Sequence, residues 1–299
     1  MTGRRAVLIV NPFATAVDEH RIALVERTLG RGADVTTFLT ERRGHATELA
    51  REAAEWADAI FVFSGDGGFN EALNGLRPDG PPLGCIPGGG TSVLPRALGI
   101  PRDAVEAAGR LADALEQGRT RAISVGVVNG RRFGFNAGLG FDAELVRRIE
   151  ANRSRAGRPG DLAFVATVMR LVAENRARFR PALEIESIGR AAFAFVANAD
   201  PYTFVGAIPL HVAPEARFEG GLDLIAPRSI GPLDVPRIVK YVATGRGQLE
   251  DPRILSAHDL DRIEIRCDRP LPLQVDGEDL GDVVEATFEC ERGAVRVLV

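Results

Sequence analysis

The feature that most constrains the fold is a series of short apolar runs, each of which ends in a turn-rich loop. The runs Arg5–Val10, Ala59–Phe63 and Leu83–Ile86 have the character of buried strands, and segments with helical spacing separate them. Strands that alternate with helices predict a parallel sheet covered on both faces. Ligands of such sheets bind at the carboxyl ends of the strands, so the loops after these runs are candidates for a site.

These three loops are expected at one edge of the sheet. Asn11-Pro12 follows the first run, Ser64-Gly65-Asp66-Gly67-Gly68 the second, and Pro87–Ser92 the third. A glycine-rich turn from strand to helix exposes backbone N–H groups and the positive end of the helix, and both favour phosphate. Glycine also lets the backbone approach a ligand closely. Two such loops at neighbouring strand ends favour a phosphate site over ordinary turns.

Asp66 is unexpected in a loop that only binds anions, because its carboxylate would repel phosphate. The residue is explained if Mg²⁺ lies between the carboxylate and the phosphates. The alternative is an ordinary turn in which Asp66 caps the following helix. The loop by itself leaves both interpretations open.

Composition excludes some classes of protein. The chain has 299 residues, a net charge of -4 and a sequence pI of about 5.7, which argues against a nucleic-acid binder. Lys240 is the only lysine, so anion binding must use arginine, backbone amides or metal. Three widely spaced cysteines predict neither a disulfide framework nor a zinc site, and a reducing cytoplasm is expected. No apolar stretch has the length of a transmembrane helix.

The pattern changes near residue 122. Two β-type runs, Ala122–Val128 and Arg131–Asn136, are joined by Asn129-Gly130, which predicts a hairpin. Later runs are mostly strand-like, with one helix expected at Leu233–Val242. The polar segment Asn152–Gly160 predicts a loop between two helices. The second part of the chain is therefore predicted to be a mainly antiparallel β domain.

Further short motifs follow one another along the chain. They are Thr40 with Gly44-His45-Ala46, Asn74-Gly75, Phe135–Ala143, Ala213–Ala216 with Gly221-Leu222-Asp223, and Val275-Asp276-Gly277-Glu278. Together with the two glycine-rich loops, this series resembles the diacylglycerol kinase and sphingosine kinase catalytic-domain family, which includes bacterial lipid kinases. The resemblance covers nearly the whole chain.

The resemblance implies an α/β fold with an N-terminal Rossmann-like parallel-sheet domain and a C-terminal mainly antiparallel β domain. The first domain, residues 1–122, would bind ATP, and the last strand, 294–299, would return to it. The second domain, residues 123–293, would bind the lipid. The implied activity is transfer of the γ-phosphate of ATP to a hydroxyl of a diacylglycerol-like or sphingoid-like lipid. The implied partner is a lipid at a membrane surface, so a cytoplasmic protein peripheral to the membrane is expected, and a homodimer is compatible with the resemblance.

The loops and the resemblance together assign contacts to ATP and Mg²⁺. The expected set is Asn11, Pro12, Thr40, Ser64, Gly65, Asp66, Gly67, Gly68, Asn70, Glu71, Gly89, Gly90 and Thr91. Asp66 is expected to hold the metal through the phosphates. Glu278 matches the residue that the family uses as proton acceptor, and phosphoryl transfer to a hydroxyl needs a carboxylate in that role. From the residues alone, Asp276-Gly277 is also compatible with a plain hairpin turn.

The chain departs from the family at four places. Gly68 stands where threonine is frequent, Ser92 where asparagine is usual, and Leu94-Pro95 where Phe-Ala is usual. Gly220-Gly221 replaces an Asp-Gly pair, whose aspartate helps to hold a structural Mg²⁺ in bacterial members. A glycine has no side chain that can bind a metal, so the second metal site would need Glu219, one position earlier, to take the place of the aspartate through a shift of the backbone.

Two other functions compete with the lipid kinase. One is a catalytically weak lipid-binding or nucleotide-binding regulatory protein on the same scaffold, which the departures motivate. The other is NAD kinase, which uses a similar glycine-rich loop. In NAD kinase the Asn-Glu pair lies well downstream of that loop, whereas Asn70-Glu71 follows it directly here, and this spacing argues against NAD kinase.

Overall fold

The structure is a computed structural model, and it describes residues 3–156 and 161–299. The chain divides into two compact units. Unit 1 comprises residues 1–125 and 292–299, and unit 2 comprises residues 126–291. Each unit is considered by itself below.

Unit 1 contains a parallel sheet. Its strands are β1 (Arg4–Val10), β2 (Ala33–Leu39), β3 (Ala59–Ser64) and β4 (Leu83–Pro87), in the spatial order β2-β1-β3-β4. The end of the last strand, β16 (Glu278–Leu298), adds to this sheet in parallel, because Val297 pairs with Leu83 of β4.

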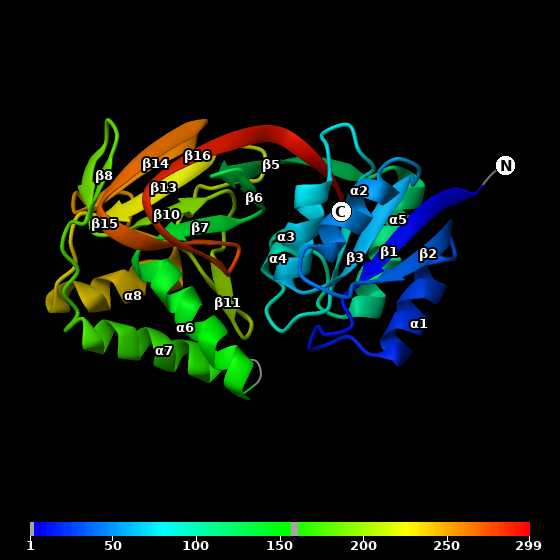
Figure 1. The fold of residues 1–299 in the computed structure, drawn as a ribbon, viewed down its shortest axis with the longest axis horizontal. Helices are drawn as coiled ribbons and strands as arrows, with labels where there is room; N and C mark the ends of the chain where they lie inside the picture. The colour runs from blue at the N-terminus through cyan, green and yellow to red at the C-terminus, as the bar shows by residue number, and fades with distance from the viewer. Residues whose placement is uncertain (1–2, 157–160) are drawn as a thin grey trace. The chain divides into compact units, whose positions relative to one another are not determined.

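Two layers of helices cover this sheet (Figure 1). Helix α1 packs against α5, and α2 packs against α3. Strands β3 and β4 are buried along their whole length, as expected when helices lie on both faces. The helices of unit 1 are α1 (Glu19–Leu29), α2 (His45–Ala53), α3 (Asp66–Gly75), α4 (Val93–Ala97) and α5 (Ala104–Gln117).

The strand order creates a switch point between β1 and β3. The chain leaves β1 through α1 toward β2 at one edge, and leaves β3 through α3 toward β4 at the other. Loops that diverge in this way leave a crevice at the carboxyl ends of the two strands, where open α/β sheets bind ligands. Asn11 and Gly65 are the first residues after β1 and β3, so both lie at this switch point.

Unit 2 is built on antiparallel pairs. Strands β14, β13, β10, β7, β15 and β16 follow one another in space, and each neighbouring pair in this series is antiparallel. The observed mixture of a parallel unit and an antiparallel unit confirms the predicted fold class.

Strand β5 (Thr120–Val128) crosses from unit 1 to unit 2. The strands that follow are β6 (Arg131–Phe133), β7 (Asn136–Leu139), β8 (Leu183–Ile185), β9 (Gly189–Ala191), β10 (Ala194–Ala197), β11 (Thr203–Val205), β12 (Ile208–Leu210), β13 (Leu222–Pro227), β14 (Ile254–Leu260) and β15 (Arg262–Val275).

Three helices gather on one face of the unit 2 sheet: α6 (Phe141–Ala156), α7 (Asp161–Glu174) and α8 (Val235–Thr244) (Figure 1). Within residues 3–156 and 161–299, none of the helices combines the length and apolar character that crossing a bilayer requires. Helix α8 follows a short 3-10 turn, Pro232–Asp234. The predicted helix at 233–242 therefore exists, with its α-helical part beginning at Val235.

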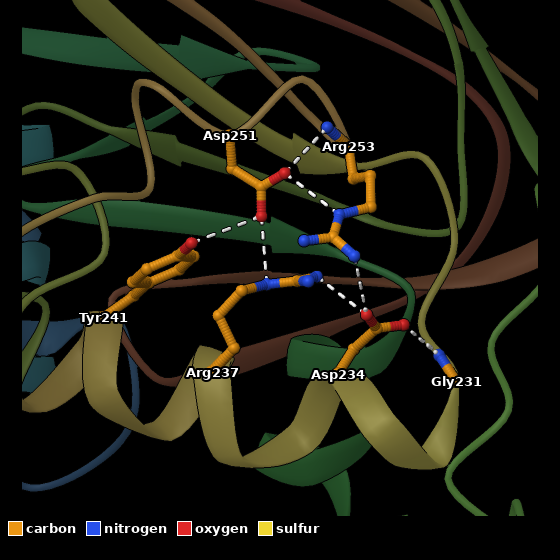
Figure 2. A network of polar contacts seen from close by, with 6 residues as sticks. All are labelled: Gly231, Asp234, Arg237, Tyr241, Asp251 and Arg253. Atoms are coloured by element: carbon orange, nitrogen blue, oxygen red, sulfur yellow. Dashed lines mark hydrogen bonds and ion pairs between the residues drawn. The ribbon is translucent and has the colours of Figure 1, made fainter.

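A polar network anchors α8, as Figure 2 shows. The carboxylate of Asp251 is almost fully buried and lies 2.9 Å from Nε of Arg237 on α8. The same carboxylate accepts hydrogen bonds from the Arg253 backbone and side chain and from the Tyr241 hydroxyl. Asp234 accepts from Arg237 and from the amide of Gly231 at the helix entrance. A buried carboxylate that two guanidiniums neutralise fixes α8 to the segment before β14.

Some predicted boundaries differ from the structure. The Asn129-Gly130 hairpin is confirmed, with both residues at positive φ between the antiparallel strands β5 and β6. Two of the later strand-like runs, 263–267 and 273–275, form one long strand, β15, with a register shift between them. Helix α6 continues to Ala156, so the loop predicted to begin at Asn152 is helical at its start, and residues 157–160 lie outside the described residues.

Candidate functional site

The loops after β1, β3 and β4 meet at one edge of the unit 1 sheet. The amide of Asn11 donates to the carbonyl of Phe63 at the end of β3 (3.1 Å). The amide of Gly88 donates to the carbonyl of Ser64 (2.7 Å), and the carbonyl of Gly88 accepts from the amide of Ala16 (2.9 Å). The prediction that the three loops converge is therefore confirmed.

The two glycine-rich loops touch through their backbones. A Cβ atom placed on Gly65 would lie 3.5 Å from the Cα atom of Gly89. Gly88 has no room for a side chain, since its Cβ would lie 2.8 Å from the Val17 side chain and 3.1 Å from the backbone of Ser64. Glycine at position 88 therefore lets the two strand-to-helix turns approach closely, whereas a Cβ on Gly65 would make an ordinary van der Waals contact.

Asp66 does not cap its own helix. The N-cap of α3 is Gly65, which makes no side-chain bond, and Asp66 is the first helical residue. Its Oδ1 instead accepts from the amide of Leu94 at the start of α4, at 3.3 Å. Burial, and then the nearby Asp66 charge, raise the pKa of the Cys85 thiol in β4. Asp66 therefore joins the two glycine-rich loops and brings a negative charge to their junction.

Ser92 begins α4 in the left-handed region, with φ of +49°. Asparagine adopts this region more readily than serine, because its short polar side chain bonds locally. The backbone at this position thus keeps the conformation that asparagine, the usual residue of the family, would favour. The hydroxyl of Ser92 makes a local hydrogen bond in its place, to the carbonyl of Gly89 (3.2 Å).

The departure at Gly68 is coupled to Ser64. A Cβ atom on Gly68 would lie 2.2 Å from the Ser64 hydroxyl oxygen and 2.6 Å from the Ser64 Cβ. The Ser64 side chain therefore fills the space that a side chain at position 68 would need. This hydroxyl is fully buried and has no hydrogen-bond partner among the described residues. The Ser64 side chain thus provides a hydroxyl in this loop, although Gly68 lacks the hydroxyl that a threonine at position 68 would have.

A double-mutant cycle tests this coupling. Gly68→Thr is expected to lower the free energy of unfolding by roughly 1–3 kcal/mol, because it overpacks the buried space against Ser64. The same change in a Ser64→Gly background is expected to cost less, with a coupling energy of about 1–2 kcal/mol. Urea unfolding of the four proteins measures it. Additive effects would show that the two positions do not share one space.

The other predicted nucleotide residues in unit 1 are distributed around this junction. Gly67 and Gly90 are exposed, as is Pro12, and no atom lies within 4 Å of a Cβ placed on Gly67. Thr91 is half-buried. Thr40 is buried at the end of β2, where its amide donates to the carbonyl of Val10 (2.8 Å).

Asn70 and Glu71 have contacts within the fold. Asn70 is 2% exposed, and its carbonyl and side-chain oxygen accept from Nδ2 of Asn74 one turn later in α3. A carboxylate oxygen of Glu71 accepts from the amide of Ala46 (3.2 Å) in the first turn of α2, whose N-cap Gly44 has no side chain to do so. Glu71 therefore supplies the cap of α2, and this contact explains the residue without a nucleotide.

In unit 2, Asp276-Gly277 forms the hairpin turn between β15 and β16. Val275 pairs with Glu278, and the two turn residues have φ of +47° and +82°. The carboxylate of Asp276 is buried and accepts from three consecutive amides, Gly134, Phe135 and Asn136, at 2.6, 3.0 and 3.0 Å. The plain-turn interpretation of the backbone is thus correct, and Asp276 serves to fix the turn.

Glu278 is the carboxylate that this turn leaves accessible. Its side chain is 29% exposed, and one of its oxygens lies 2.8 Å from a guanidinium nitrogen of Arg131 on β6. An arginine that holds one carboxylate oxygen restricts the rotamers of the side chain. This geometry suits a group that must accept a proton from a defined direction.

A buried polar network lies behind the Glu278 turn. Gln274 accepts from the amide of Gly277 (2.9 Å) and donates to Asp142 (2.5 Å) and Asn136 (3.0 Å). Asp142 also accepts from the hydroxyl of Tyr202. Burial raises the pKa of Asp142 to about 6, although the bonds from Tyr202 and Gln274 oppose this shift.

The segment at Gly220-Gly221 shows how the chain accommodates the absent aspartate. The carboxylate of Asp259 accepts from the amide of Gly221 at 2.6 Å, and a Cβ on Gly220 would lie 3.5 Å from the same carboxylate. Across residues 3–156 and 161–299, no cluster of three or more His, Cys, Asp or Glu side chains is arranged to hold a metal.

Sequence reasoning missed several residues that shape these regions. Gly88, Arg131, Asp142 and Gln274 were not singled out, although each contacts a candidate site residue or its turn. Gly88 and Asp142 lie inside motifs that the sequence shows, Pro87–Ser92 and Phe135–Ala143. Arg131 and Gln274 carry no signal in the sequence, because their partners are far away along the chain.

Comparison with known proteins agrees with the geometry. Residues 5–128 match the model of the diacylglycerol kinase catalytic domain, and residues 136–299 match that of the YegS C-terminal NAD kinase beta sandwich-like domain. A diacylglycerol kinase of Bacillus subtilis is 29% identical over 293 residues, which cover 92% of this chain and 90% of that protein. A diacylglycerol kinase of Staphylococcus aureus is 35% identical over 139 residues, or 44% of this chain and 42% of that protein.

Solved structures show the same fold. The crystal structure of a diacylglycerol kinase from Bacillus anthracis has a TM-score of 0.73 and 23% sequence identity, with 99% of this chain and 96% of that chain covered. Together, the two family models cover nearly the whole sequence, in the order in which the two units occur. The chain therefore belongs to the diacylglycerol kinase family.

Proposed function

We propose that the protein is a lipid kinase that transfers the γ-phosphate of ATP to a lipid hydroxyl, with diacylglycerol-like acceptors ahead of sphingoid-like ones. The observation that carries the proposal is the close contact of the two glycine-rich loops, with Gly65 and Gly89 backbone to backbone, at the switch point of a parallel sheet. Family membership supports the reaction class. In this proposal unit 1 (residues 1–125 and 292–299) binds ATP, and unit 2 (residues 126–291) binds the lipid.

Backbone amides of the two loops bind the phosphates. The first turn of α3 and the segment Gly89–Thr91 supply N–H groups, and the α3 N-terminus adds its positive dipole. Asn11 adds a side chain: its Oδ1 accepts from the amide of Phe13 (2.9 Å), which orients the amide nitrogen. These donors replace the lysine that many phosphate sites use.

Mg²⁺ fits the residues at this junction. The ion prefers oxygen ligands and is commonly bound by one or two carboxylates together with substrate phosphates. Asp66 is one half-buried carboxylate between two phosphate-binding loops, so it suits an ion that the phosphates also hold. When bound, the metal neutralises charge on the triphosphate.

Glu278 accepts the proton of the lipid hydroxyl. Arg131 holds one oxygen of its carboxylate, and Asp276 and Gln274 fix the turn from which it projects. A carboxylate positioned in this way lets the hydroxyl oxygen attack the γ-phosphate as its proton leaves. The protein acts at the membrane surface as a peripheral cytoplasmic enzyme.

The direct test is incubation of the pure protein with γ-labelled ATP, Mg²⁺ and a panel of lipids in detergent micelles. Labelled lipid is expected for a diacylglycerol, and ATP with Mg²⁺ is expected to raise the melting temperature. If ATP stabilises the protein but no lipid is labelled, the regulatory alternative gains support. If neither occurs, the kinase proposal is wrong.

A variant at Gly67 separates nucleotide binding from folding. Gly67→Ala adds a methyl group where the fold leaves open space, so the melting temperature is expected to stay the same or rise. If phosphates lie against this backbone, the methyl group blocks them, and the affinity for ATP is expected to fall at least about tenfold. Isothermal titration with an ATP analogue that cannot be hydrolysed measures it.

Gly109→Ala is the matched control for this variant. Gly109 also lies in a helix, α5, and its Cβ would meet only the Thr28 methyl group at 3.8 Å. This substitution is expected to stabilise the helix by about 0.5–1 kcal/mol and to leave ATP affinity unchanged. Unchanged affinity in Gly67→Ala would show that the nucleotide does not approach this turn.

A further inference from the structure

Strands β11 and β12 of unit 2 form a hairpin, residues 203–210, that stands apart from the large sheet. The two strands pair in antiparallel register as a two-stranded sheet of their own. A hairpin of two strands is at best marginally stable in water unless other parts of the fold support it. Its position in the protein therefore depends on the contacts at its base.

Polar contacts hold both ends of this hairpin. Before β11, the hydroxyl of Tyr202 donates to the carboxylate of Asp142. After β12, the amide of His211 donates to the carbonyl of Val242 in α8 at 2.7 Å. The ring of His211 also bonds through Nδ1 to the carboxylate of Asp200, so the residues on the two sides of the hairpin are joined directly.

The hairpin is apolar on both faces and carries no charged side chain. Val205 and Ile208 lie opposite each other and share one face, whereas Phe204 and Pro209 share the other. All eight residues are described, none of them is buried, and Ile208 is 61% exposed. Neighbouring apolar side chains that the fold holds in place but leaves in water indicate a binding surface.

The base of the hairpin is linked to the turn that carries Glu278. The link is Asn136, which is only 4% exposed. Its Nδ2 donates to the carbonyl of Tyr202 at 3.1 Å, and its own carbonyl accepts from the amide of Asp276 at 2.8 Å. Because Asp276 lies two residues before Glu278, a lipid whose hydroxyl reaches Glu278 has the hairpin within reach of its acyl chains.

The chemistry of the hairpin favours hydrocarbon as the occupant. Its side chains include a single hydroxyl, that of Thr203, and no group that would neutralise a phosphate or a cationic amine. Branched and aromatic side chains such as Ile208 and Phe204 make many dispersion contacts with methylene groups. Removal of both apolar surfaces from water stabilises the contact in proportion to the area buried.

We infer that hairpin 203–210 binds an acyl chain of the acceptor lipid while the hydroxyl of that lipid lies at Glu278. The inference rests on the proposed function for the acceptor, and it assigns the surface that holds the hydrocarbon part. The hairpin thereby gives the site a preference for acceptors with long acyl chains.

The test is binding of a diacylglycerol with a fluorescent label on one acyl chain to the full chain without ATP. Wild-type protein is expected to bind this probe saturably, and dioctanoylglycerol is expected to displace it far better than dibutyrylglycerol. The double variant Val205→Thr/Ile208→Thr keeps β-branched side chains but loses apolar surface, so the Kd for the probe is expected to rise at least about tenfold. The preference for the longer chains is expected to shrink with it. Wild-type protein without saturable binding, or an unchanged Kd in the variant, would overturn the inference.

Val284→Thr is the matched control for the single variant Val205→Thr. Val284 is 55% exposed on β16 in unit 2, outside the hairpin, and the substitution makes the same chemical change. Val205→Thr is expected to weaken probe binding about threefold, and Val284→Thr to leave it unchanged. Equal losses in the two variants would contradict the inference, because diffuse apolar contact would then explain binding. Melting temperatures show that the variants fold.

The experiment separates this inference from the kinase proposal because binding needs no turnover. A protein that binds the probe through the hairpin but transfers no phosphate contradicts the kinase proposal alone. A protein that phosphorylates diacylglycerol while all variants bind the probe equally contradicts the inference alone. Analytical ultracentrifugation tests the other occupant, a second copy of the chain: a lower sedimentation coefficient in the double variant with an unchanged Kd would assign the hairpin to contact between copies and overturn the inference.

Discussion

Replacing Glu278 by glutamine is expected to lower kcat for lipid phosphorylation by roughly 10²–10⁴-fold, with little change in the KM for ATP. Glutamine keeps the shape of the side chain and one oxygen for the bond with Arg131, but it cannot accept the hydroxyl proton. A loss confined to kcat would place the defect in the chemical step. Initial rates with labelled ATP over a range of lipid and ATP concentrations separate the two parameters.

Asp279→Asn is the control for this variant, since Asp279 is the adjacent carboxylate. It pairs with Arg147 at 2.7 Å, and this pair lowers the pKa of Asp279. Its replacement is expected to weaken the attachment of α6 and to leave kcat within about threefold, since the residue has no place in the proposed proton transfer. If Glu278→Gln turns over as fast as Asp279→Asn, another group takes the proton and the assignment of Glu278 fails.

The parallel half of the fold could be predicted because its signals are local. Each of the runs at β1, β3 and β4 is apolar over consecutive residues, and each ends in glycine or in Asn-Pro. The convergence of the loops follows from parallel pairing alone, so the sequence predicts that the loops of Gly65 and Gly89 lie near each other, as they do.

What could not be predicted depends on pairs that are distant in sequence. The bond between Gln274 and Asp142 spans 132 residues, and the bond between Arg131 and Glu278 spans 147. No periodicity marks such partners. The contact of Glu71 is hidden for the same reason: its carboxylate accepts from the amide of Ala46 in α2, 25 residues earlier in the chain. Position in a motif does not reveal the direction of a side chain.

Asp142 leads to a second large effect, on stability. Its pKa is raised from 3.8 to about 6, mainly by burial, and it lies in a network without a cationic partner among the described residues. In the folded protein the carboxyl group therefore keeps its proton at pH values where the unfolded chain has lost it. Since the folded state then binds more protons, the free energy of unfolding must fall as the pH rises from about 4 to about 6.

Asp142→Asn should remove this dependence. Asparagine does not titrate, so the free energy of unfolding of the variant lacks this fall. The difference between variant and wild type is therefore expected to shift by roughly 3 kcal/mol in favour of the variant between pH 4 and pH 7, whatever the difference, or offset, is at pH 4. The offset itself is expected to be small, because an amide with Oδ1 toward Nε2 of Gln274 turns its nitrogen to the Tyr202 hydroxyl, whose oxygen can accept. Urea unfolding followed by far-ultraviolet circular dichroism at several pH values measures both quantities.

Tyr202→Phe is the informative partner of this variant. The bond from the Tyr202 hydroxyl lowers the pKa of Asp142, so its removal should raise that pKa further and extend the fall in stability to pH values above 6. The two variants should thus move the pH dependence in opposite directions, one abolishing it and one widening it. Parallel curves of the free energy of unfolding against pH for wild type and Asp142→Asn would show that Asp142 is ionised in the folded protein throughout this range. Another group of the buried network would then have to carry a compensating proton.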